Sequence, residues 1–101
     1  MPIEARLDLH GMSQIQAHHA LERFILRCHA RGMRCVLLVT GKGTPRASST
    51  GTDDRKTGIL KQKVPEWLRE GALYDLVLKI ETARPKDGGE GALYVLLRRK
   101  R

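Results

Sequence analysis

Five consecutive apolar residues, 35–39, constrain the fold of this chain more than any other segment. A strand without polar alternation is typical of the centre of a sheet, where both faces are covered. Residues 3–10 precede it and alternate between apolar and polar side chains, which predicts a strand with one buried face. An amphipathic segment separates the two. Strand, helix and strand in this order predict two parallel neighbouring strands with a right-handed crossover.

The segment between these strands carries the start and stop signals of a helix. Ser13 with Gln16 three residues later matches a capping box, and Gly32 supplies a C-terminal stop. One helical face collects the apolar residues Ala17, Leu21, Phe24, Ile25 and Cys28. Another face repeats a cation every fourth residue, at Arg23, Arg27 and Arg31. We interpret this stripe as a solvated face, with phosphate binding as the alternative.

The rest of the chain predicts one more helix and two more strands. Residues 44–57 lack periodicity and predict a mobile loop, and residues 58–70 form an amphipathic helix that Pro65 should bend or split. Strands follow at 76–80 and 92–97. The order βαβαββ, with two helices and four strands, predicts an α/β two-layer sandwich with a mixed sheet.

Length and charge limit the class of protein. A chain of 101 residues fits one domain, here 1–101, with a core at about 6–98 and a basic tail at 98–101. The net charge of +8 favours a polyanionic partner, although a solvated tail is the alternative for the last four residues. No membrane span or signal peptide is recognised, and no membrane partner is expected. Cys28 and Cys35 are interpreted as buried hydrophobes in a reducing compartment, which predicts the cytoplasm.

Polar residues with useful chemistry follow the first two strands. On a strand, Asp8 and His10 would point to the same side, before a turn at Gly11. The second strand ends in a glycine-lysine turn, residues 40–43. Because ligands bind at the carboxyl ends of parallel strands, these groups should converge. A carboxylate, an imidazole and a lysine there predict a site that grips or cleaves a phosphodiester.

Other notable residues have ordinary structural explanations. A glycine-lysine turn alone is common, and residues 88–91 are typical of a flexible connection between strands. His18 and His19 are adjacent on a helix and diverge by about 100°, so they do not suit a shared metal. Trp67 is interpreted as a core anchor.

Three segments together resemble a known family. The sequences LDLHG at 7–11, TGKG at 40–43 and GGEGALYVLLR at 88–98 are similar to those of the small MutS-related (Smr) domain family, over about 6–98. The resemblance implies a βαβαββ sandwich similar to the C-terminal domain of translation initiation factor three. It also implies binding of DNA or RNA, and endonuclease activity as in several members.

The family's motifs carry over by position. Its Asp-x-His motif falls on Asp8 and His10, which implies a catalytic role for both. Its HGxG motif falls on residues 40–43, where Thr40 replaces the histidine of many members. The resemblance implies substrate binding by Thr40, Gly41, Lys42, Gly43, Arg46, Gly88, Gly89, Gly91 and Arg98.

We therefore expect an endonuclease domain that nicks or cleaves DNA or RNA. His10 would act as general base, Asp8 would orient it or hold a cation, and Lys42 with the Gly41 and Gly43 amides would stabilise charge on phosphorus. No resident cofactor is expected, with a divalent cation such as Mg²⁺ or Mn²⁺ as the alternative. The competing hypotheses are a non-catalytic module that binds nucleic acid or ribosomes, and a domain that docks on acidic protein surfaces.

Overall fold

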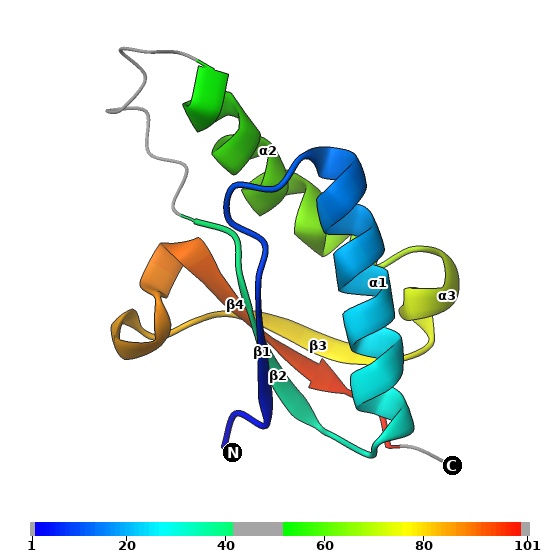
Figure 1. Ribbon diagram of the computed structural model, residues 1–101. Coiled ribbons are helices and arrows are strands. Elements are labelled where there is room, and N and C mark those ends of the chain that lie inside the picture. The colour runs from blue at the N-terminus through cyan, green and yellow to red at the C-terminus, as the bar shows by residue number, and fades with distance from the viewer. Residues whose placement is uncertain (1, 42–51, 100–101) are drawn as a thin grey trace.

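The computed structural model describes residues 2–41 and 52–99, with side chains from residue 59 onward in the second range. The elements in chain order are β1 (Ala5–Asp8), α1 (Gln14–Ala30), β2 (Cys35–Val39), α2 (Thr52–Leu68), α3 (Gly71–Tyr74), β3 (Val77–Thr82), the short 3₁₀ helices η2 (Pro85–Asp87) and η3 (Gly89–Gly91), and β4 (Ala92–Leu97). The sheet order is β1-β2-β4-β3. Strands β1 and β2 are parallel, and β4 runs antiparallel to both of its neighbours. The α-helices lie on one side of this sheet, which confirms the predicted two-layer α/β fold (Figure 1).

Helix α1 begins and ends where its sequence signals predict. The Ser13 hydroxyl accepts the Gln16 backbone N–H at 3.2 Å, and the Gln16 side-chain oxygen accepts the Ser13 N–H at 3.2 Å. This reciprocal pair satisfies two N–H groups that a helix start leaves without partners. At the other end Gly32 takes φ +78°, and its N–H donates to the His29 carbonyl at 3.0 Å. A left-handed residue here ends the helix and favours glycine.

Helix α2 is longer than predicted. It begins at Thr52, so residues 52–57 are helical although the sequence predicted a loop over 44–57. Residues 44–51 of that loop lie outside the described part of the chain. The polar stretch 52–58 has no apolar periodicity, and periodicity was the basis of the prediction. Pro65 does not split the helix, which continues to Leu68.

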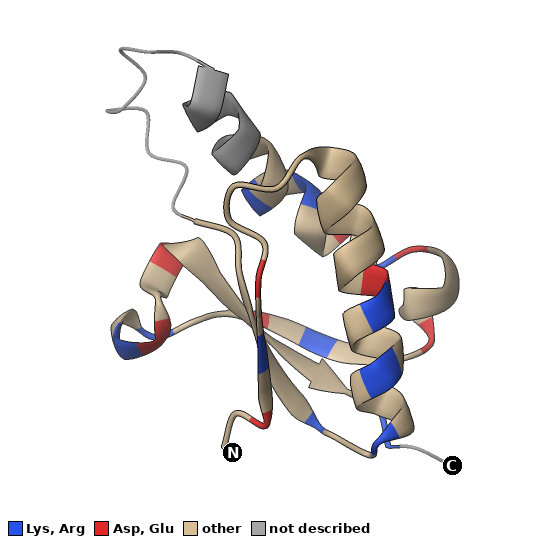
Figure 2. Cartoon of the chain, in the orientation of Figure 1, with Lys and Arg blue, Asp and Glu red and all other residues tan. Residues whose placement is uncertain are grey.

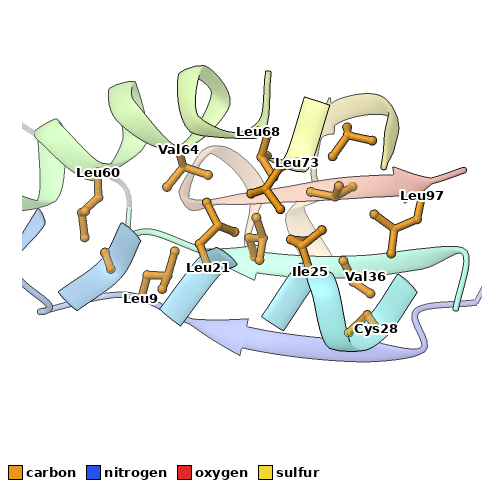
Figure 3. Close-up of a cluster of buried hydrophobic side chains, with 14 residues drawn as sticks. Leu9, Leu21, Ile25, Cys28, Val36, Leu60, Val64, Leu68, Leu73 and Leu97 are labelled. Carbon is orange, nitrogen blue, oxygen red and sulfur yellow. The ribbon is translucent and has the colours of Figure 1, made fainter. Parts of the chain in front are cut away.

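One hydrophobic core lies between the helices and the sheet (Figure 3). Its completely or almost completely buried members come from α1, α2, α3, three strands and the residue after β1, and they include Leu9, Leu21, Ile25, Val36, Leu38, Leu60, Val64, Leu68, Leu73, Val95 and Leu97. Trp67 packs at the margin of this core and stacks on the His18 ring, with centroids 4.5 Å apart and planes 9° apart. The apolar face predicted for α1 is therefore confirmed.

The opposite sheet face carries a smaller apolar cluster. Leu37, Ala83 and Ala92 are buried there, with Val39 and Tyr94 packed against them. The Tyr94 hydroxyl donates to the Asp87 carboxylate, which ties β4 to η2. That hydrogen bond raises the pKa of Tyr94.

The two cysteines are free and buried, as predicted. Burial raises the pKa of both the Cys28 and the Cys35 thiol, so the neutral form of each is favoured. Among residues 2–41 and 52–99, no helix has the length and apolar character needed to cross a membrane.

Candidate functional site

The ends of β1 and β2 meet the start of β4 at one end of the sheet. The Leu9 N–H donates to the Val39 carbonyl at 2.7 Å, which extends the β1–β2 pairing by one residue. Val39 is paired with Ala92, and the Thr40 N–H donates to the Gly91 carbonyl at 2.8 Å. Three motifs that are far apart in the sequence are therefore joined by backbone hydrogen bonds. The expected convergence of strand ends is present (Figure 1).

Asp8 and His10 are arranged differently from the sequence prediction. Strand β1 ends at Asp8, and His10 belongs to the turn that follows. The Asp8 Oδ1 atom accepts the backbone N–H of His10 at 2.9 Å, a turn in which the carboxylate caps the main chain. The strand is shorter than predicted, because it stops two residues before His10. Both side chains are exposed, and Gly11 completes the turn at φ +85°.

Thr40 is a structural residue of this site. Its side chain is almost completely buried, with 1% exposure, and its hydroxyl lies 3.1 Å from the Gly41 carbonyl and 3.4 Å from the Gly91 carbonyl. The threonine hydroxyl therefore contacts carbonyl groups on both sides of the place where the end of β2 meets the start of β4.

The Gly41 amide already has a partner within the protein. Its N–H donates to the Gly91 carbonyl at 3.1 Å, and Gly41 takes φ +88°. The Gly91 carbonyl thus receives two main-chain donors from the end of β2. This arrangement does not fit the expectation that the Gly41 amide is a free donor for a phosphate.

The glycines before β4 also use their amides internally. The N–H groups of Gly88, Gly89 and Gly91 donate to the carbonyls of Pro85, Arg84 and Gly88, at 3.2, 2.9 and 3.0 Å. Gly88 has φ +117°, a value that side chains rarely tolerate. These contacts build the compact turn that presents the Gly91 carbonyl to β2. Direct substrate binding by these glycines stays a prediction.

The remaining predicted residues do not join this site within the described structure. Lys42, Gly43 and Arg46 lie outside the described residues. Arg98 follows the opposite end of β4, where its N–H donates to the Leu76 carbonyl at 2.8 Å. Strand β4 therefore separates Arg98 from Gly91, and substrate binding by Arg98 stays a prediction.

The fold brings one cation to the site that sequence reasoning missed. Lys61 of α2 forms an ion pair with Glu90 of η3, with 3.6 Å between nitrogen and oxygen. Both side chains are exposed, and such a pair contributes only about 0–1 kcal/mol. A competing phosphate can therefore release Lys61 at little cost. No local sequence signal marks it, since only the packing of α2 places it next to η3.

A metal centre built by the protein is not found among the described residues. Within that part of the chain, no three His, Cys, Asp or Glu side chains are grouped closely enough to hold a metal ion. Asp8 has one oxygen on the His10 backbone. The described donor set therefore does not fit a metal held by protein side chains alone.

Known proteins are similar to this chain in sequence and in fold. The Smr domain family matches residues 7–98. The ribosome rescue factor SmrB of Vibrio vulnificus is 36% identical over 91 residues, and that of Tolumonas auensis is 33% identical over 91 residues. Each alignment covers 90% of this chain and 43% of the relative, so the chain spans less than half the length of these relatives.

Two solved structures resemble the fold. YdaL, a stand-alone small MutS-related protein from Escherichia coli, has a TM-score of 0.77 and 34% identity, covering 97% of this chain and 67% of YdaL. The Smr domain of Thermus thermophilus MutS2 has a TM-score of 0.72 and 28% identity, covering 93% of this chain and 98% of that domain. With the motifs, the sheet order and the family match in agreement, this chain belongs to the Smr domain family.

Proposed function

We propose that the chain is a nucleic-acid endonuclease domain that cleaves phosphodiester bonds beside the β1–α1 turn. The observation that carries this proposal is the junction of three motifs, where His10 lies exposed next to strand ends that are tied to the glycine turn before β4. The net charge of +8 supports a polyanionic substrate. An exposed imidazole is a side chain that can act as a general base on a bound substrate.

His10 supplies the reactive group in this proposal. On RNA it removes the proton of a 2′-hydroxyl, whose oxygen attacks the neighbouring phosphorus while the 5′-oxygen leaves with a proton from solvent. The products are a 2′,3′-cyclic phosphate and a free 5′-hydroxyl. Asp8 acts as a positioning residue, because its carboxylate holds the backbone of the turn that carries His10. Lys61 stabilises the added negative charge once it leaves Glu90.

Ribosome-associated RNA is the substrate class that the relatives favour. The matched proteins are called ribosome rescue factors, and this chain aligns with them over 90% of its length. We therefore propose RNA as the first substrate to test, with ribosomes as the partner and the cytoplasm as the location. DNA remains the comparison substrate.

A second function is favoured by a specific observation. The Gly41 amide is already bonded within the protein, so it is not free to stabilise a transition state, and one Asp8 oxygen is occupied by the His10 backbone. A module that binds RNA or ribosomes without cleavage would need only exposed cations. Binding without turnover by the wild-type chain would establish this alternative.

A cleavage panel separates the two functions. Single-stranded RNA, duplex DNA and branched DNA are incubated with the wild type, His10→Ala and His19→Ala, with and without EDTA. His19 is an exposed imidazole on α1, outside the junction, and serves as the matched control. We expect RNA cleavage that falls about 10²–10⁴-fold in His10→Ala and stays at the wild-type level in His19→Ala. Equal cleavage by all three proteins would refute the role of His10.

A further inference from the structure

A cationic surface lies at the end of the sheet opposite the candidate site. We call it the distal surface and define it by Arg34, Arg69, Tyr74, Leu78, Arg98 and Arg99. It contains two neighbouring hollows of about 590 and 290 Å³, which share Leu78 and Arg98. Lys and Arg positions gather near the C-terminus of the chain and on α1 in Figure 2.

Several elements end together to build this surface. Arg34 precedes β2, and Arg69 follows α2. A bulge in β3 between Val77 and Lys79 leaves the Leu78 side chain 52% exposed, and Tyr74 of α3 is 64% exposed. The Arg34 side chain is fixed by its Nε–H, which donates to the Leu97 carbonyl at 3.0 Å. The surface therefore combines a held guanidinium with an exposed aromatic ring and an apolar side chain.

The charge of the distal surface is poorly balanced. Its hollows are lined by four arginines and by a single carboxylate, Asp75. The ion pairs found between described residues all use lysines, and none joins these arginines to a described carboxylate. At the candidate site, by contrast, Lys61 already faces Glu90. Planar guanidinium groups match the geometry of phosphates and bind them through two parallel hydrogen bonds.

We propose that the distal surface is a second contact for the nucleic-acid strand held at the candidate site. The arginines bind backbone phosphates, and the Tyr74 ring stacks on an unpaired base. This inference rests on the proposed function. Arg98 follows Gly91 by seven residues along β4, which corresponds to about 23 Å at the rise of an extended strand. At roughly 3.4 Å of axial rise per nucleotide, the spacing of a strand stacked as in a duplex, about seven nucleotides span this distance.

The length dependence of binding tests this proposal. Fluorescence anisotropy measures the affinity of the 101-residue chain for single-stranded RNA of 4 to 16 nucleotides in several salt concentrations. We expect wild-type affinity to rise sharply once the strand spans both surfaces. Arg69→Gln/Arg99→Gln should bind the 16-mer about tenfold more weakly. The slope of the logarithm of its binding constant against the logarithm of the salt concentration should decrease in magnitude by about 1.4, or 0.7 for each lost phosphate contact. Tyr74→Ala should weaken the binding of single-stranded RNA about tenfold and leave the binding of duplex RNA unaltered.

Matched controls make the outcome decisive. Arg6→Gln/Arg23→Gln removes the same charge from exposed positions on β1 and α1, outside the distal surface. An equal loss of 16-mer affinity in this control would show a general charge effect and overturn the proposal. Unaltered RNA binding by Arg69→Gln/Arg99→Gln, with loss of binding to phosphatidylserine vesicles or to an acidic protein, would also overturn it.

The two proposals fail in distinguishable ways. If the endonuclease proposal is wrong, no substrate is cleaved, but the dependence of affinity on strand length is still measured. If the distal surface has no role, His10-dependent cleavage persists, while the length dependence is the same in the wild type and in Arg69→Gln/Arg99→Gln.

Discussion

Gly88 offers the sharpest test of how the glycine turn supports the site. A Cβ atom at this position would lie 2.8 Å from the Ala92 Cβ, whereas carbon atoms in favourable contact are about 3.5–4.0 Å apart. The Ala92 Cβ is attached directly to the backbone, so no side-chain rotation relieves the clash. The backbone conformation of Gly88, φ +117° and ψ −9°, adds strain for any other residue.

The expected cost of Gly88→Ala follows from these two terms. The backbone term is about 1–3 kcal/mol, and the forced shift of a packed strand adds about 1–3 kcal/mol. We therefore expect the free energy of unfolding to fall by about 3 kcal/mol. With a urea dependence near 2 kcal/mol/M, the unfolding midpoint should fall by about 1.5 M. Because β4 starts at Ala92, RNA binding at the junction should weaken as well.

Gly89 is the matched control for Gly88. Gly89 has φ +55°, and a Cβ there would meet nothing within 4 Å. Gly89→Ala should therefore cost only the left-handed backbone term of about 1–2 kcal/mol. Gly88→Ala/Ala92→Gly should recover part of the loss, with an interaction energy of about 1 kcal/mol or more in a double-mutant cycle. Equal costs for the two alanine variants, or additivity in the cycle, would refute the steric explanation.

Three further predictions concern the elements around the site. Thr40→His should lower the free energy of unfolding by about 1–3 kcal/mol in urea titrations, because the ring overpacks a buried position. Thr40→Val should lower it by less, since the Gly91 carbonyl keeps its two main-chain donors. Ser13→Ala should cost about 1 kcal/mol by the same assay, and Ser13→Asp should keep wild-type stability because it also caps. The backbone N–H groups of Arg34 and Cys35 hold the pKa of Glu4 below its usual range. The contribution of Glu4 to folding stability is therefore present above the unfolded pKa and is lost as pH falls through the folded pKa. Glu4→Gln should make stability less dependent on pH in that range, measured by thermal unfolding from pH 3 to pH 7.

Local signals predicted much of the fold. The capping pair Ser13 and Gln16, the stop at Gly32 and the apolar strand 35–39 each act over a few residues, and the structure confirms all of them. The start of α2 could not be found by periodicity, because residues 52–58 are polar. Thr52 followed by two aspartates is a sequence signal for a helix start that periodicity overlooks.

The candidate site was less predictable, because it depends on how strand ends are bonded. The sequence placed Asp8, Thr40 and Gly91 at strand ends, and the topology joins those segments. It did not show that Asp8 caps the His10 amide in a local turn. It also did not show that Gly41 donates to Gly91, since that contact depends on tertiary backbone geometry. Lys61 was missed for the same reason.

The central pairing of β2 with β4 determines when the site can form. These strands come from distant parts of the chain, and Val39 can pair only after Ala92 has been synthesised. During synthesis, the β1–α1–β2 unit emerges first, with one edge of β2 unpaired. Pairing β2 with β4 closes the long chain segment between them, which is entropically costly. We therefore expect the pairing of β2 with β4 to limit the folding rate. A nascent chain that stops before β4 therefore carries His10 but lacks the Gly91 carbonyl that ties the end of β2 in place.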